Sequence, residues 1–263
     1  MIAKTLREYR RALIGWTAGI GAYMVLYVSV YASVKESPEV YGPAALAKFP
    51  EGMRDLLGGL QDFTSGPGYL QTTVYQLFLP FLFLACAMIV ANRALAQPEE
   101  AGTLELLVTL PVSRGRLLLR RYAALVIGLA AVAAVTLLVT WAMAEAVEME
   151  VPFGRILAAH TGVLLLGLFF GTVTMAVGAA TGRKGPGMAV TGVWAVLGYV
   201  AVTAGQSVDA LAWLKWLSPF HYYGSGQPLY NGLPVGDYLV LAGATAVLAL
   251  TAVLAFDRRD VGV

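Results

Sequence analysis

The sequence predicts an all-α, polytopic membrane protein. Of its 263 residues, 58% are hydrophobic and 13% are charged, and the mean hydropathy is +0.70. Soluble domains carry about 25% charged residues. Charge-free apolar runs of about 20 residues, long enough to cross a bilayer, occur six times along the chain. The net charge of +2 gives no reason to expect a nucleic-acid partner.

We expect one transmembrane domain over residues 1–263. Residues 1–11 form a basic amphipathic segment, for which two interpretations stay open: an interfacial helix on the membrane surface, or a charged tail that only sets the topology. The loop 35–71 is expected to hold a short helix with Met53, Leu56 and Leu60 on its apolar face, lying flat at the outer interface. The six spans are predicted at 12–34, 72–91, 122–144, 156–181, 187–206 and 238–256.

The basic residues predict the orientation of these spans. With both termini placed on one side of the membrane, thirteen of the eighteen Lys and Arg residues fall on that side and five on the other. Basic loops stay in the cytoplasm. We therefore expect both termini, and the connection between the second and third spans, to be cytoplasmic.

That connection, residues 97–116, is the longest charged segment in the apolar part of the chain. Pro98 suits the first turn of a helix, and Glu99 and Glu100 place negative charge at its electropositive start. Leucines and valine then recur at helical spacing until Leu110-Pro111 ends the pattern. Ser113 is expected to cap the following helix. The segment therefore predicts a short amphipathic helix, over about 98–109, followed by a sharp bend.

Small residues mark two predicted helix-packing faces. Gly15 and Gly19 are spaced for close helix approach in the first span. In the fourth span Gly167, Gly171 and Gly178 lie on one face, together with His160. We expect this groove to receive another helix, from this chain or from a second copy. A lone histidine there is expected to make a helix–helix hydrogen bond.

The loop before the sixth span, 207–237, is unusually aromatic. Ser207 is expected to cap an apolar helix that carries Trp213 and Trp216 and breaks at Ser218-Pro219. Tryptophan and tyrosine favour the membrane–water interface. The pattern predicts an interfacial helix or a re-entrant element before the sixth span.

Several kinds of chemistry are absent from the sequence. No predicted span contains Asp, Glu, Lys or Arg in its interior, which argues against an ion-coupled carrier. There is no His-Glu-x-x-His zinc motif and no phosphate-binding loop. The single cysteine, Cys86, is expected to pack within the second span. We predict no catalytic residue and no metal site; Ser225 beside His221 is the one nucleophile–base pair that an enzymatic alternative would use.

The central segment, with Glu99-Glu100-Ala101-Gly102-Thr103-Leu104-Glu105-Leu106-Leu107 and then Leu110-Pro111-Val112-Ser113-Arg114, resembles the connection between the second and third spans of ABC-2-type transporter permeases. The six spans, the cytoplasmic termini and Ser218-Pro219-Phe220 agree with the same family. The resemblance implies that about 98–109 is a coupling helix, which docks on a separate ATP-binding subunit. The implied coupling residues are Glu99, Glu100, Gly102, Thr103, Leu104, Glu105, Leu107 and Val108.

The resemblance also implies the assembly. Two copies of the permease would form the translocation path between them in a prokaryotic plasma (inner) membrane. Two ATP-binding subunits would hold the ATP and magnesium, so this chain itself would bind no cofactor. Its partners would be these subunits, a second permease and membrane lipids. Because the predicted spans lack charge, we expect a hydrophobic or amphipathic cargo, such as an antibiotic, another drug or a lipid-like molecule.

Two alternatives of other classes stay open at this point. An ion-coupled or facilitative carrier would work without an ATPase, and a membrane enzyme would use His221 and Ser225. Aromatic residues of the second and fifth spans are candidates for cargo contact, although most such residues only pack: Tyr75, Phe78, Phe81, Phe83, Trp194 and Tyr199.

Overall fold

The computed structural model describes residues 2–42, 48, 63–100, 102, 114–207 and 209–258. Within these ranges every regular element is a helix. The elements are α1 (Ile2–Ser29), α2 (Tyr31–Lys35), α3 (Pro38–Tyr41), α6 (Gly66–Leu70), the π-helix η1 (Gln71–Tyr75), α7 (Phe78–Ala94), α8 (Ala96–Glu100), α10 (Arg114–Ala146), α11 (Phe153–Thr181), α12 (Lys184–Ser207), the 3₁₀-helix η2 (Asp209–Leu217), α13 (Pro219–Gly224), α14 (Pro228–Asn231) and α15 (Val235–Arg258).

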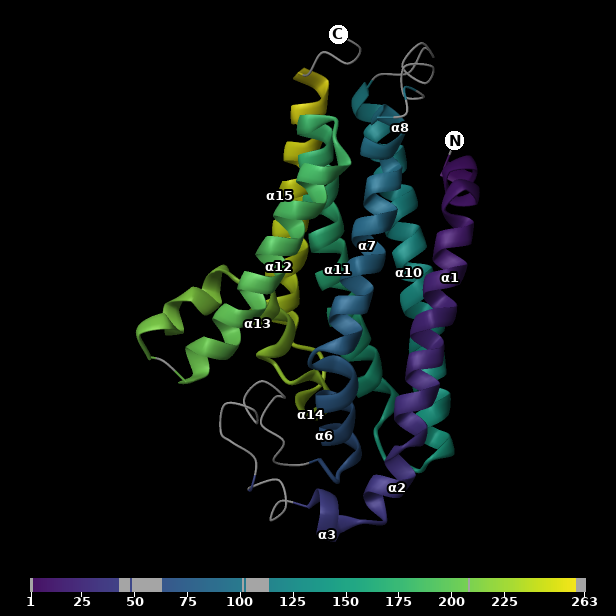
Figure 1. The fold of residues 1–263 in the computed structure, drawn as a ribbon, viewed down its shortest axis with the longest axis vertical. Coiled ribbons are helices and arrows are strands. Elements are labelled where there is room, and N and C mark those ends of the chain that lie inside the picture. The colour runs from purple at the N-terminus through teal and green to yellow at the C-terminus, as the bar shows by residue number, and fades with distance from the viewer. Residues whose placement is uncertain are drawn as a thin grey trace.

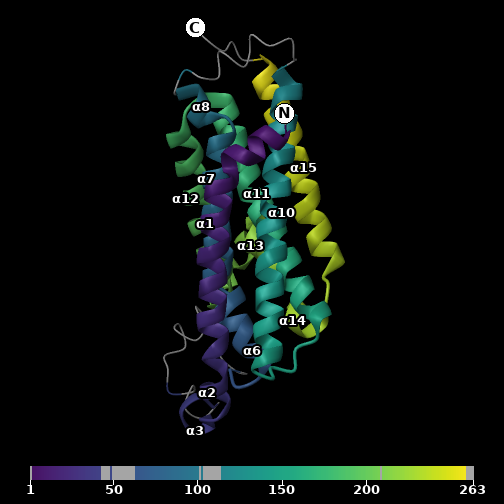
Figure 2. The same ribbon diagram turned by 90° about the vertical axis from the view of Figure 1, so that its right-hand side faces the viewer.

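Six helical stretches are long and apolar enough to cross a membrane, which confirms the predicted class and number of spans. They are Ile2–Lys35, Gly66–Ala94, Gly115–Ala146, Phe153–Thr181, Lys184–Gly205 and Val235–Asp257. Each extends beyond its apolar window at one or both ends, because polar residues continue a helix past the hydrocarbon layer. Residues 2–11 of the basic segment accordingly belong to α1, whose first turns bend across the bundle towards α10 in Figure 2. Tyr9 in these turns is only 1% exposed.

The long helices run roughly side by side, and the chain ends meet at one end of the bundle. Figure 1 shows the start of α1, α8 and the end of α15 together at this end, which we call the termini end. The helices α2, α3 and α14 lie towards the opposite end, which we call the far end. The termini end therefore gathers the basic segments of the sequence, as the charge distribution predicts.

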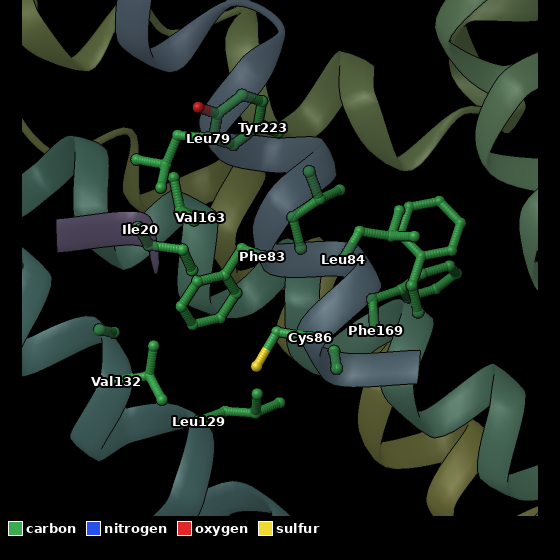
Figure 3. Close-up of a cluster of buried hydrophobic side chains, with 14 of the residues drawn as sticks. Ile20, Leu79, Phe83, Leu84, Cys86, Leu129, Val132, Val163, Phe169 and Tyr223 are labelled. Atoms are coloured by element: carbon green, nitrogen blue, oxygen red, sulfur yellow. The ribbon is translucent and has the colours of Figure 1, made fainter. Parts of the chain in front are cut away.

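Two helices, α7 and α11, form the centre. In the most apolar stretches of α11 and of the α6–α7 unit, 67% and 61% of the residues are buried, against 17–22% in α1, α12 and α15. Figure 3 shows side chains of α1, α7, α10, α11 and α13 meeting there, with Cys86 of α7 close to Leu129 of α10. Cys86 is fully buried, as expected for a packing residue.

Three elements differ from their predicted forms. The second span contains the π-helix η1, which no periodicity signals. The helix expected after Ser207 is a 3₁₀-helix over residues 209–217, and Ser207, the expected cap, is the last residue of α12. The break at Ser218-Pro219 is confirmed: the Ser218 hydroxyl accepts a hydrogen bond from Phe220 N–H at 3.2 Å and so caps α13. The helix expected around Met53–Leu60 lies outside the described residues.

Candidate functional site

The segment expected to couple to an ATP-binding subunit begins in α8, at the termini end. Instead of starting at Pro98, the helix starts at Ala96, after a backbone break at Leu95 (φ −140°). It ends at Glu100, and Gly102 turns the chain with a φ of +67°, a conformation that favours glycine. Its remaining predicted coupling residues, Thr103, Leu104, Glu105, Leu107 and Val108, lie outside the described residues.

Glu100 reaches across to the connection between α11 and α12. One of its carboxylate oxygens accepts a hydrogen bond from the backbone N–H of Lys184 at 2.8 Å. The other lies 3.5 Å from the Lys184 ammonium group. The structure thus brings a predicted coupling residue into contact with the first residue of the fifth span, and no sequence pattern indicated this contact.

Buried polar groups hold the second and third spans together at the termini end. The guanidinium of Arg121 on α10 is only 5% exposed and donates to the backbone oxygen of Ala94. Asn92, two residues before Ala94 on α7, is 7% exposed, and its Oδ1 has no hydrogen-bond partner within the described part of the chain. In the sequence, Arg121 contributed only to the predicted orientation of the spans, because a basic residue beside an apolar span is expected at the membrane interface.

The glycine face of α11 lies against α7 and α8 of the same chain. A Cβ atom at Gly167 would overlap the ring of Phe83, and one at Gly171 would lie 3.3 Å from the Ala87 methyl. Gly178 is similarly close to Ala96, at 3.4 Å. The groove predicted on the fourth span is therefore occupied by the second span.

Gly15 and Gly19 on α1 are placed differently. A Cβ at either position would meet nothing within 4 Å among the described residues. Exposed apolar side chains such as Ile14, at 58% exposure, lie beside them. This face is free to meet lipid or another chain.

At the far end, a tyrosine–histidine network joins the second, fourth and sixth spans. The Tyr75 hydroxyl and His160 Nδ1 are 2.6 Å apart, so the predicted helix–helix hydrogen bond is present. The Tyr223 hydroxyl donates to the Tyr75 backbone oxygen at 2.7 Å, and the Tyr238 hydroxyl donates to Ala158 at 3.0 Å. All four of these aromatic side chains are buried. The network was not predicted, because three of its partners come from separate, distant segments.

The aromatic residues considered for cargo contact divide into two groups. Tyr75 and Phe83 are almost completely buried, so they pack the core. Phe78 on α7 and Trp194 on α12 are 46% and 36% exposed. Between these helices, Phe81 stacks on Phe220 with ring centroids 5.5 Å apart. The two exposed rings lie in different surroundings: Phe78 is beside Tyr23 and Tyr27 of α1, and Trp194 is edge-on to Phe169 of α11.

The residues of the enzymatic alternative do not form a nucleophile–base pair. The Ser225 hydroxyl donates to Asp237 at 2.7 Å, whereas the His221 ring packs edge-on against Trp216 and Tyr222. Burial lowers the pKa of His221, against the raising effect of Asp237, and Lys215 lowers it further. Over the described ranges, no group of three or more His, Cys, Asp or Glu residues is placed to hold a metal ion.

Comparison with known proteins agrees with this arrangement. Residues 2–257 match the family described as multidrug efflux system permease Rv1217c, C-terminal domain. The chain is also 31% identical to the probable ABC transporter permease protein NosY of Pseudomonas aeruginosa, over 239 aligned residues that cover 77% of this chain and 84% of that protein. Both matches extend over most of the six spans. The chain therefore belongs to the ABC transporter permease family, whose members are membrane-spanning subunits of transporters.

Proposed function

We propose that this chain is the membrane subunit of an ATP-driven exporter and works as a dimer with separate ATP-binding subunits. The observation that carries the proposal is the match to ABC transporter permeases along residues 2–257. ATP would be bound and hydrolysed on the partner chain, since this sequence has no phosphate-binding loop. Both termini and α8 would face the cytoplasm of a prokaryotic cell, on the side that the basic residues favour.

The coupling element would be the segment 97–116. Acidic residues flank its apolar positions, which suits an interface with a basic partner surface and a few apolar anchors. Glu100 is already engaged by Lys184, at 2.8 Å from its backbone nitrogen. Glu105 is therefore the better residue with which to test docking alone.

The cargo would be hydrophobic or amphipathic. The exposed surface of α12 is apolar, with Val193, Trp194 and Leu197 at 58%, 36% and 62% exposure. Such a surface binds apolar molecules without desolvating a charge. A second copy facing this surface would enclose a path between the two permeases.

Co-purification from the native membrane tests the assembly. We expect the wild-type chain to bring down a protein that is labelled by a photoreactive ATP analogue. Glu105→Lys should lose that protein, since like charges at an interface repel. Glu39→Lys, a matched reversal at an exposed position of α3 near the far end, should retain it.

Two outcomes would contradict the proposal. Wild-type chain that purifies under gentle conditions without any nucleotide-binding partner would favour the carrier alternative. Equal retention by Glu105→Lys and the wild type would remove the segment 97–116 from the docking surface.

A further inference from the structure

The helix α8 is attached at both ends to the corner where α11 turns into α12. At its start, Ala96 packs against Gly178 near the end of α11. At its end, Glu100 holds Lys184, the first residue of α12. The first described part of the coupling segment is therefore in contact with two spans that are distant from it in sequence.

The bond from Glu100 to the backbone is the stronger part of this second attachment. The side chains of Lys184 and Glu100 are 60% and 32% exposed, and exposed ion pairs contribute little to stability. The backbone N–H of Lys184 is one of the donors that the start of a helix leaves without an intrahelical partner. A carboxylate there makes a charge-assisted hydrogen bond and is also favoured by the helix dipole. A displacement of Glu100 would therefore pull on the backbone of α12.

The helix α12 is less enclosed than the neighbouring helices α7 and α11. It follows α11 after a short turn at Gly182, whose φ is +70°. Only 22% of its most apolar stretch is buried. The 2.9 Å hydrogen bond between the hydroxyls of Thr174 and Thr191 joins its first half to α11.

The other end of α12 is connected to the element before the sixth span. The Ser218 hydroxyl donates to the Gly198 backbone oxygen at 2.8 Å. Ser218 also caps α13, which carries Tyr223 of the far-end network. Figure 1 shows α12 running from the region of α8 to that of α13. A movement of α12 would thus reach both ends of the bundle.

We propose that Glu100 is a positioning residue that transmits movement of the segment 97–116 to α12, through its hydrogen bond to the Lys184 backbone. This inference rests on the proposed function, because a separate ATP-binding subunit must move the segment. The family resemblance implied a docking role for Glu100, but Lys184 of the same chain engages both of its carboxylate oxygens. The inference therefore replaces that docking role with a role inside the permease. Nucleotide binding on the partner would then shift α12 relative to the central helix α11 and its neighbour α10.

Distance measurements between spin labels can test the inference without knowing the cargo. Labels are attached to cysteines that replace two exposed residues, Val190 on α12 and Leu119 on α10, in a Cys86→Ala chain. Labelled chain is diluted with unlabelled chain, so that each dimer holds one labelled copy. The complex with the co-purified ATP-binding subunit is measured without nucleotide and with ATP and vanadate.

We expect the wild-type distance to shift with nucleotide and Glu100→Ala to lose that shift while still binding the subunit and hydrolysing ATP. Glu100→Gln keeps an oxygen that can accept from Lys184 N–H, so it should retain the shift. Lys184→Met keeps the backbone donor and should retain most of it. Arg183→Met, at the exposed neighbouring position, is the matched control and should behave as the wild type.

The outcomes separate this inference from the function on which it rests. A wild-type distance that nucleotide leaves unchanged, or an equal shift in Glu100→Ala, overturns the role of Glu100 while the exporter assembly stands. A Glu100→Ala chain that folds but no longer binds the subunit assigns Glu100 to docking and also overturns the inference. If no ATP-binding subunit joins the wild-type chain, the proposed function fails, and this inference fails with it.

Discussion

The central helix α11 and the outer helix α12 are adjacent in sequence but are held in different ways. Most of α11 is buried, its face of Gly167, Gly171 and Gly178 packs against side chains of α7 and α8, and His160 lies within hydrogen-bond distance of Tyr75. In contrast, α12 exposes a row of apolar side chains, including Val193 and Leu197 at 58% and 62% exposure. Composition does not explain this difference, because both helices are rich in glycine and valine. The difference comes from packing. Other helices enclose α11, whereas part of the surface of α12 is left for lipid, cargo or a second copy.

The largest effect should come from filling the glycine face of α11. Gly167→Leu would drive a side chain into the buried ring of Phe83, and overpacking of this kind costs about 1–3 kcal/mol or more. Gly19→Leu on α1 meets open space and should change the free energy of unfolding by less than about 0.5 kcal/mol. Unfolding of the detergent-solubilised chain measures both. Equal destabilisation by the two variants would contradict the distinction between the buried central helix α11 and the exposed outer helices.

A smaller effect is expected from the far-end network. Tyr75→Phe leaves His160 Nδ1 with only the weaker contact to the Ile156 backbone oxygen at 3.3 Å, and a buried polar group that loses its partner costs about 1–3 kcal/mol. The matched control on α12 is Thr203→Val, which removes a bond to the preceding turn of the same helix and should cost less than about 0.5 kcal/mol. A double-mutant cycle with His160→Leu should give a coupling energy for the Tyr75–His160 pair. A coupling energy of zero would show that the Tyr75–His160 bond does not stabilise the packing of the second span against the fourth.

The smallest effect is the pH dependence of the free energy of unfolding that His221 causes. Burial lowers the pKa of His221 from its ordinary value of 6.5, so below that pH the unfolded chain binds more protons than the folded chain. The free energy of unfolding should therefore fall as pH drops from about 7 towards 5. His221→Gln should flatten this dependence in melting curves recorded across that range. A wild-type chain that gains stability at low pH relative to the variant would reverse the sign and contradict this environment for His221.

The spans could be predicted because bilayer thickness imposes a length and a composition on each helix. The face formed by Gly167, Gly171 and Gly178 could be predicted from spacing alone, but its partner could not, because the second span carries no complementary pattern. The helix that carries Trp213 and Trp216 could be predicted, but its 3₁₀ form could not, and nothing in the sequence indicated the π-helix η1, because the period of an apolar pattern does not distinguish these helix types.

The candidate site was only partly predictable for a related reason. The acidic and apolar pattern of 97–116 indicated an interaction segment, whereas the bond from Glu100 to Lys184 depends on where the α11–α12 turn lies. Arg121 was counted among the basic residues outside the spans, yet the fold buries it, and the burial of Asn92 was not predicted. Contacts between remote segments leave no periodic trace in one sequence.

ATP-dependent transport in inside-out membrane vesicles tests the central claim most directly. Vesicles contain this chain with its co-purified ATP-binding subunit, and a panel of lipophilic fluorescent dyes serves as cargo. The account predicts dye accumulation that requires both ATP and the ATP-binding subunit and that persists when ionophores collapse the proton and sodium gradients. Accumulation by the permease alone, driven by an ion gradient and abolished by ionophores, would contradict it.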